Sequence, residues 1–116
     1  MNLYVVVENT KTRDLVNKSL DFSRFDKIQD IVVNGRNTIG SYARSVRLIA
    51  QEKGIPSKIL VIFNAEGMDD RRLNIATAEK EEACITTNRS KKMRVFGYST
   101  DRHNKIVNNI QSFLNK

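Results

Sequence analysis

Acidic and amide side chains follow two apolar runs of the sequence, at the points where those runs end. Residues 59–63 are an unbroken apolar run followed by Asn64 and Glu66, and the β-branched and aromatic run 3–7 is followed by Glu8. Short apolar runs closed by polar residues are typical of buried strands, and an open parallel sheet carries its working residues just beyond the carboxyl ends of its strands. Carboxylate and amide oxygens of this kind are the ligands that Mg²⁺ accepts. Strand ends are also ordinarily polar, so spacing alone leaves both interpretations open.

Groups suited to phosphate follow the first two predicted strands. The second predicted strand, residues 28–33, is interrupted by Asp30 and ends in a turn that contains Gly35, Arg36 and Asn37, and Lys11 lies just after the first strand. A glycine turn can present backbone N–H groups to an anion, and cationic side chains make charge-assisted hydrogen bonds with phosphate oxygens. We therefore expect phosphate or nucleic acid to bind beside the predicted metal site.

The elements that must position these residues follow one another in alternation. We expect strands at 3–7, 28–33, 59–63 and 93–98, and helices over 10–20, 38–53, 71–83 and 102–114. Strand–helix units of these lengths predict right-handed crossovers and an α/β fold, with a four-stranded parallel sheet covered by helices on both faces. The expected order is β-α-β-α-β-α-β-α, a Rossmann-like arrangement, and we expect residues 1–116 to form a single domain.

Local signals predict several helix ends and buried faces. Thr10 or Thr12 is expected to cap the first helix, Gly54 to end the second, and Asp69 or Asp70 to cap the third. Apolar residues at helical spacing are expected to face the core. In the second and fourth helices these are Tyr42, Val46, Leu48, Ile49, Ile106, Val107, Ile110, Phe113 and Leu114.

Composition bounds the partners and the compartment. The 116 residues include 20 Lys and Arg against 13 Asp and Glu, which gives a net charge of +7, and the pI is about 9.8. A basic protein of this kind is expected to bind polyanions such as nucleic acid, or an acidic protein surface. The single cysteine, Cys84, excludes an internal disulfide. No apolar run reaches the roughly 18 residues of a membrane span, so we expect no membrane association and a cytoplasmic protein.

These residues resemble the Toprim domain, the small α/β metal-binding module of topoisomerases, primases and nucleases of the overcoming-lysogenization-defect type. The family pattern has a first strand ending in Glu-Gly with an Asp three residues further on, a second strand ending in a glycine-rich turn, and a third ending in Asp-x-Asp. The corresponding segments here read VVVENTKT, IVVNGRNTIGSYARSVRLI and VIFNAEGMDD. Glu8 matches the invariant acid, whereas Asn9 and Thr12 replace Gly and Asp. Asn64 and Glu66 stand at the Asp pair.

The resemblance implies a stand-alone Toprim-like protein that binds or acts on nucleic acid, with a magnesium-dependent nuclease as its catalytic form. The family Glu works as acid or base and the Asp pair holds the metal. This implies Glu8 as the catalytic residue, and Glu8, Asn64 and Glu66 as metal ligands. Asp69 and Asp70 lie where family members often carry additional acids. Because Asn64 lacks a charge and Glu66 reaches further than Asp, we expect weakened magnesium binding.

Two other functions stay open at the level of sequence. A non-catalytic Toprim-like adaptor or decoy would bind a protein partner. A receiver-like phosphoacceptor domain is also α/β, but it needs an Asp at the end of its central strand, where this chain has Asn64. A nuclease is expected to lose metal-dependent cleavage on Glu8→Gln, and a nucleic-acid binder to lose salt-sensitive affinity on Arg36→Ala.

Overall fold

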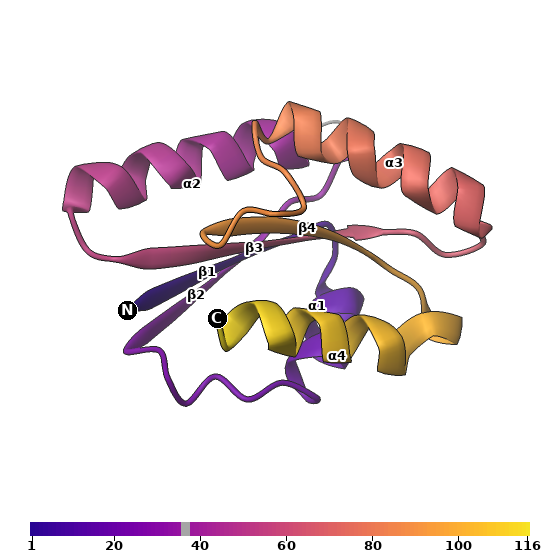
Figure 1. Ribbon diagram of the computed structural model, residues 1–116, viewed down its shortest axis with the longest axis horizontal. Coiled ribbons are helices and arrows are strands. Elements are labelled where there is room, and N and C mark those ends of the chain that lie inside the picture. Colours follow the sequence, from indigo (N-terminus) through magenta and orange to yellow (C-terminus); the bar gives the residue numbers. More distant parts are fainter. Residues whose placement is uncertain (36–37) are drawn as a thin grey trace.

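The computed structural model describes residues 1–35 and 38–116, so the predicted site residues Arg36 and Asn37 lie outside the described residues. Strands and helices alternate along the chain (Figure 1). In chain order they are β1 (Asn2–Val7), α1 (Thr10–Asn17), β2 (Lys27–Val32), α2 (Ile39–Lys53), β3 (Ser57–Asn64), α3 (Asp70–Ala83), β4 (Met93–Tyr98), the 3₁₀ helix η1 (Thr100–Arg102) and α4 (His103–Leu114). This confirms the predicted α/β order.

The four strands form one parallel sheet in the order β2-β1-β3-β4. Val6 of β1 lies opposite Ile31 of β2 and Val61 of β3, and Val61 also lies opposite Val95 of β4. Because β1 and β3 are central and covered on both faces, Val6 and Val61 are inaccessible to solvent. Burial on both faces explains why these two strands are continuous apolar runs rather than alternating ones.

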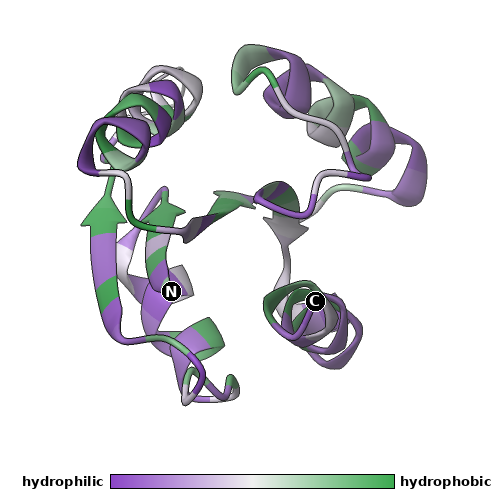
Figure 2. Cartoon of the chain, turned by 60° about the vertical axis from the view of Figure 1, so that its left-hand side comes forward, coloured by the Kyte–Doolittle hydropathy of each residue, from purple (hydrophilic) through white to green (hydrophobic). Residues whose placement is uncertain are grey.

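Helices cover both faces of the sheet (Figures 1 and 2). α1 and α4 lie on one face, where Val16 and Ile110 pack in a cluster that includes Leu60 of β3. α2 and α3 lie on the other face, where Ile39 packs in a second cluster that includes Val61. Successive strand residues point to opposite faces, so Leu60 and Val61 contribute to different halves of the core.

The two edge strands differ in exposure. Residues 27–30, the first four of β2, are exposed. Because this part of the strand faces solvent, it can contain a charged residue such as Asp30. β4 forms the other edge, and its residues are buried apart from Arg94, which is partly buried.

A buried lysine joins β3 to the end of α4. Lys58 is only 3% exposed, and its Nζ donates to the carbonyl oxygens of Phe113 and Leu114. These carbonyls lie at the C-terminal end of the helix, where main-chain acceptors have no partner within the helix. Burial lowers the pKa of Lys58, and the two acceptors help to hold its charged form in place.

The structure corrects the local prediction in α1 and α2. α1 ends at Asn17 instead of near residue 20, and its cap is Asn9, whose Oδ1 accepts a hydrogen bond from Thr12 N at 2.8 Å. The buried face of α2 is formed by small residues and two aliphatic ones, whereas the predicted large side chains, apart from Val46, are exposed. The buried residues are Ile39, Gly40, Ala43 and Val46, and the exposed ones are Tyr42, Leu48 and Ile49.

The other predicted helix features agree with the structure. α2 ends at Gly54, whose φ of 65° is the left-handed conformation that favours glycine. All five predicted core residues of α4 are buried. In the described part of the chain, no helix combines the length and apolarity that crossing a membrane requires.

Candidate functional site

The chain leaves the sheet in opposite directions at the carboxyl ends of β1 and β3. After β1 it enters α1 on one face, and after β3 it enters α3 on the other. The two strands are neighbours in the sheet. Ligands of open α/β sheets bind at such a reversal, because the departing loops leave a crevice between them. Glu8 follows β1 and Asn64 ends β3, so both predicted residues lie at this reversal. We call the carboxyl ends of these two strands the crevice.

Glu8 is a partly buried acid in the crevice. Its Oε1 accepts a long hydrogen bond of 3.4 Å from Asn64 N. Burial raises the pKa of the Glu8 carboxyl, while the nearby charge of Lys80 and the Asn64 hydrogen bond lower it by less. Glu8 therefore keeps its proton to a higher pH than an ordinary glutamate.

Glu66 joins the end of β3 to the end of β4. Its Oε1 accepts from Thr100 N at 2.7 Å and its Oε2 accepts from Thr100 Oγ1 at 3.2 Å. The Glu66 N–H donates to Asn64 Oδ1 at 3.0 Å, which closes a local turn. Both predicted ligands thus have their side-chain oxygens bonded to protein donors, and Glu66 places a carboxylate at the start of η1.

The two further predicted acids, Asp69 and Asp70, lie at the start of α3. Asp69 is the helix cap, since its Oδ1 accepts from Arg72 N at 2.8 Å. Asp70 pairs with Arg102, with 3.0 Å between Oδ1 and Nη2, and its side chain is 90% exposed. Screening by solvent makes such an exposed pair a weak contributor to stability. These contacts give both residues a structural role beside the crevice.

The described oxygens do not fit a resident magnesium ion as they are arranged. Mg²⁺ requires near-octahedral oxygen ligands at about 2.0–2.1 Å. Within residues 1–35 and 38–116, no group of three or more His, Cys, Asp or Glu side chains is placed to hold a metal. The side-chain oxygens of Asn64 and Glu66 accept hydrogen bonds from other groups. Of the two carboxylates, Glu8 is the less bonded, with one long hydrogen bond to Oε1. Magnesium binding stays a prediction.

The loop from β2 and the start of α2 border the same edge of the sheet. Gly35 is exposed, its N–H donates to Val33 O at 3.1 Å, and its carbonyl accepts from Thr38 Oγ1 at 3.2 Å. Thr38 occupies the cap position of α2 without making a side-chain cap hydrogen bond. The first N–H groups of a helix have no partner within the helix, and they suit an anion. Lys11 is exposed in the first turn of α1.

A lysine of α3, Lys80, acts electrostatically on Glu8, and the sequence did not predict this interaction. α2 and α3 lie end to end over one face of the sheet (Figure 1), and they pack at backbone distance: a Cβ placed on Gly40 would lie 2.7 Å from Ala83 Cβ. One turn before Ala83, Lys80 acts electrostatically on Glu8. A cation beside a partly buried acid is thus supplied from a helix distant in sequence. No local pattern signals it.

A second long-range contact lies on the opposite face. Tyr98 Oη lies 2.8 Å from His103 Nδ1, and Ser19 Oγ lies 3.2 Å from His103 Nε2. These hydrogen bonds connect the end of β4, the start of α4 and the segment after α1. Cys84, in contrast, is fully buried, and burial raises the pKa of its thiol, so it is an inert packing residue.

Comparison with known proteins found no matching family model, no similar curated protein and no similar solved structure. The resemblance to the Toprim domain therefore stays a prediction.

Proposed function

We propose that the protein binds nucleic acid at the carboxyl edge of its sheet, with phosphates held near Gly35, Lys11 and the start of α2. The observation that carries the proposal is the reversal between β1 and β3, because open α/β sheets ordinarily bind their ligands at such a reversal. The net charge of +7 supports a polyanionic ligand.

The groups around the crevice suit a phosphodiester. The first N–H groups of α2 are not capped by Thr38, and Lys11 and Lys80 add positive charge. An acid in a phosphate site would ordinarily repel the ligand. The raised pKa of Glu8 and its neighbour Lys80 reduce that repulsion.

The test is the binding of fluorescently labelled single-stranded and duplex oligonucleotides, measured by anisotropy at several salt concentrations. Affinity should fall linearly on a log–log plot against salt. Lys11→Ala and Arg36→Ala should each weaken binding and lower the slope by about 1 if each residue contacts one phosphate. Lys53→Ala is the matched control, since it removes one charge at the far end of α2.

Two results would overturn the proposal. One is the absence of binding at about 50 mM salt, where phosphate contacts are strong. The other is an equal effect of the Lys11, Arg36 and Lys53 substitutions, because binding would then depend on the net charge of the protein and not on a particular site.

A second candidate function is a nuclease, and the raised pKa of Glu8 favours it. A carboxyl whose pKa is shifted towards neutrality suits proton transfer to or from a phosphodiester or water. Cleavage of labelled oligonucleotides in the presence of Mg²⁺ or Mn²⁺ tests this candidate. Glu8→Gln should abolish cleavage and leave binding in place. A Glu8→Gln protein that cleaves as fast as the wild type would exclude Glu8 as the catalytic residue.

A further inference from the structure

On the outer edge of β4, some main-chain groups lie outside the hydrogen-bond ladder of the sheet, although the residues of this edge apart from Arg94 have little solvent exposure. Ile59 N donates to Lys92 O at 2.7 Å and Ala65 N donates to Tyr98 O at 2.8 Å, which fixes the ladder between β3 and β4 at both ends. In a parallel pair, alternate residues turn their N–H and C=O groups towards the neighbour. Residues 94, 96 and 98 therefore face β3, and Val95 and Gly97 face outwards.

The loop before β4 covers only the start of this edge. Met93 N donates to Ser90 Oγ at 3.2 Å, and Met93 O accepts from Thr86 Oγ1 at 2.9 Å. These side chains satisfy the outward groups of Met93 in the way that natural proteins protect edge strands. Among the described side chains, no comparable contact is made to the outward groups of Val95 and Gly97.

A cavity of about 480 Å³ follows the open part of the edge. Residues 94–97 form its floor, α3 borders it with Leu73 and Thr77, and α4 borders it with Lys105 and Asn109. A neighbouring strand lies about 4.8 Å from its partner. The part of the edge that lines the cavity spans residues 94–97, or about 13 Å at 3.3 Å per residue. The cavity thus has the position and length that a short added strand requires.

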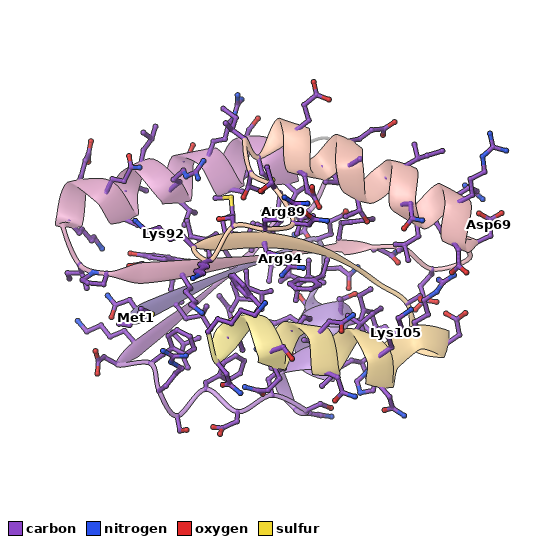
Figure 3. The ribbon with its side chains drawn as sticks, in the orientation of Figure 1. Met1, Asp69, Arg89, Lys92, Arg94 and Lys105 are labelled. Atoms are coloured by element: carbon purple, nitrogen blue, oxygen red, sulfur yellow. The ribbon has the colours of Figure 1, made fainter. Side chains whose placement is uncertain are left out.

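Three basic residues, Arg94, Arg102 and Lys105, line the side of this groove nearest α4. Two acids of α3, Asp70 and Glu81, line the other side. Asp70 pairs with Arg102, so among the described residues the unpaired positive charge of the groove lies at Arg94 and Lys105. Figure 3 shows Arg94 between β4 and α4, and Lys105 near the start of α4. Arg94 lies over the rings of Phe96 and Phe113, at 5.0 and 5.9 Å from their centroids. Its Nε is buried without a hydrogen-bond partner among the described residues. Arg94 is thus held in position by aromatic rings and retains donors for an anion.

We propose that this groove binds an extended acidic segment of another protein, which adds as a fifth strand to β4. Added strands gain affinity from main-chain hydrogen bonds and specificity from alternate side chains. Side chains that point towards α4 would meet Arg94 and Lys105, and those that point towards α3 would meet Leu73 and Val95. The segment that fits therefore alternates acidic and apolar residues.

Charge argues against the other occupant of an open edge, a second copy of the chain. Pairing of β4 with β4 of a second copy would bring Arg94 and Lys105 of both copies to one seam, and like charges across a strand pair are destabilising. Arg89 and Lys92 add to the positive charge near the start of β4 (Figure 3). The basic edge therefore disfavours self-pairing and favours an acidic strand. This partner site is separate from the crevice between β1 and β3.

The test uses the whole protein and short labelled peptides of alternating Asp and Val. This peptide should bind, and peptides of alternating Lys and Val, or with Asp and Val in separate blocks, should bind at least roughly tenfold more weakly. Two further peptides carry N-methyl groups, one on the Asp amides and one on the Val amides. Because only one set of amides can face β4, one methylated peptide should lose binding and its counterpart should keep it.

A matched pair of variants tests the basic side. Arg94→Met keeps an apolar stem over the two rings and removes the charge, so it should lower peptide affinity roughly tenfold. Lys53→Met, which removes a charge from the last turn of α2, should leave affinity unchanged. If Arg94→Met fails to fold, the methylated peptides decide the question on the unmodified protein.

Several results would overturn the proposal. These are the absence of peptide binding, equal loss with both methylated peptides, or a dimer that forms through β4 in ultracentrifugation. Oligonucleotide binding that depends on Arg94 and displaces the peptide would assign the groove to nucleic acid instead. Loss of oligonucleotide binding on Lys11→Ala bears on the crevice alone, so the two proposals can fail separately.

Discussion

The contact between α2 and α3 predicts that a methyl group added at Gly40 destabilises the fold unless the methyl group of Ala83 is removed. A Cβ on Gly40 of α2 would lie 2.7 Å from Ala83 Cβ and 3.3 Å from Ala83 C. Carbon atoms in contact ordinarily lie about 3.5–4.0 Å apart, so Gly40→Ala must displace the end of α3. Overpacking of this kind costs about 1–3 kcal/mol, and replacing Gly by Ala in a helix returns up to about 1 kcal/mol. We expect a net loss of about 1–2 kcal/mol, or about 4–8 °C in Tm for a domain of this size.

The compensating change is Ala83→Gly, which removes the methyl group that Gly40→Ala meets. Alone, Ala83→Gly should lower the free energy of unfolding by about 1 kcal/mol, because glycine has a lower helix propensity than alanine. Together, the two substitutions should be more stable than the sum of their separate effects by about 1 kcal/mol or more. Urea unfolding of the four proteins, followed by circular dichroism, measures this coupling. Additivity within about 0.5 kcal/mol would refute the contact between α2 and α3, and with it the position of Lys80 beside Glu8.

Three further predictions concern the crevice and the end of α3. Because burial raises the pKa of Glu8 in the folded protein, the contribution of Glu8 to stability is full below the unfolded pKa of about 4.3 and is lost as pH rises through the folded pKa. In urea unfolding, Glu8→Gln should therefore be more stable than the wild type at pH 7.5, and this difference in the free energy of unfolding should shrink towards pH 4. A difference that is the same at both pH values would contradict the raised pKa. Ile85 follows α3 with a φ of 54° and is 63% exposed, so Ile85→Gly should stabilise the fold by about 1 kcal/mol by relieving left-handed strain; unchanged or lower stability in urea would show that the conformation carries no strain. If magnesium binds through Glu8, Asn64 and Glu66 as the sequence predicts, Mg²⁺ at about 10 mM should raise the Tm of the wild type but not of Glu8→Gln; no rise in either protein would exclude that site.

The fold could be predicted because its signals are local. The apolar runs of β1 and β3 and the stripe of α4 are each contained in a few consecutive residues, and the order of strands and helices then restricts the topology. The prediction from sequence was wrong for the buried face of α2, where packing depends on small residues. The buried face of α2 includes Gly40 and Ala43, which no hydrophobicity pattern distinguishes from surface positions, and large apolar residues such as Leu48 are exposed.

The candidate site could be predicted only in part. Glu8 and Asn64 follow strands that are neighbours in the sheet, and strand ends are visible in sequence. Lys80 reaches Glu8 from a helix about seventy residues later, and Glu66 bonds to Thr100 in the loop after β4. Such contacts arise from the stacking of α3 and the order of β3 and β4, which no local motif encodes. The open edge of β4 also depends on strand order, since nothing within its own sequence identifies it as an edge.

The most direct test of nucleic-acid binding at the crevice is an NMR titration of the ¹⁵N-labelled protein with a short single-stranded DNA. If nucleic acid binds at the reversal between β1 and β3, the largest amide shifts should cluster at residues 7–9, Gly35 and residues 64–66, and they should diminish with added salt. Shifts confined to β4 and α4, or spread over the surface without a cluster at the ends of β1 and β3, would contradict nucleic-acid binding at the crevice.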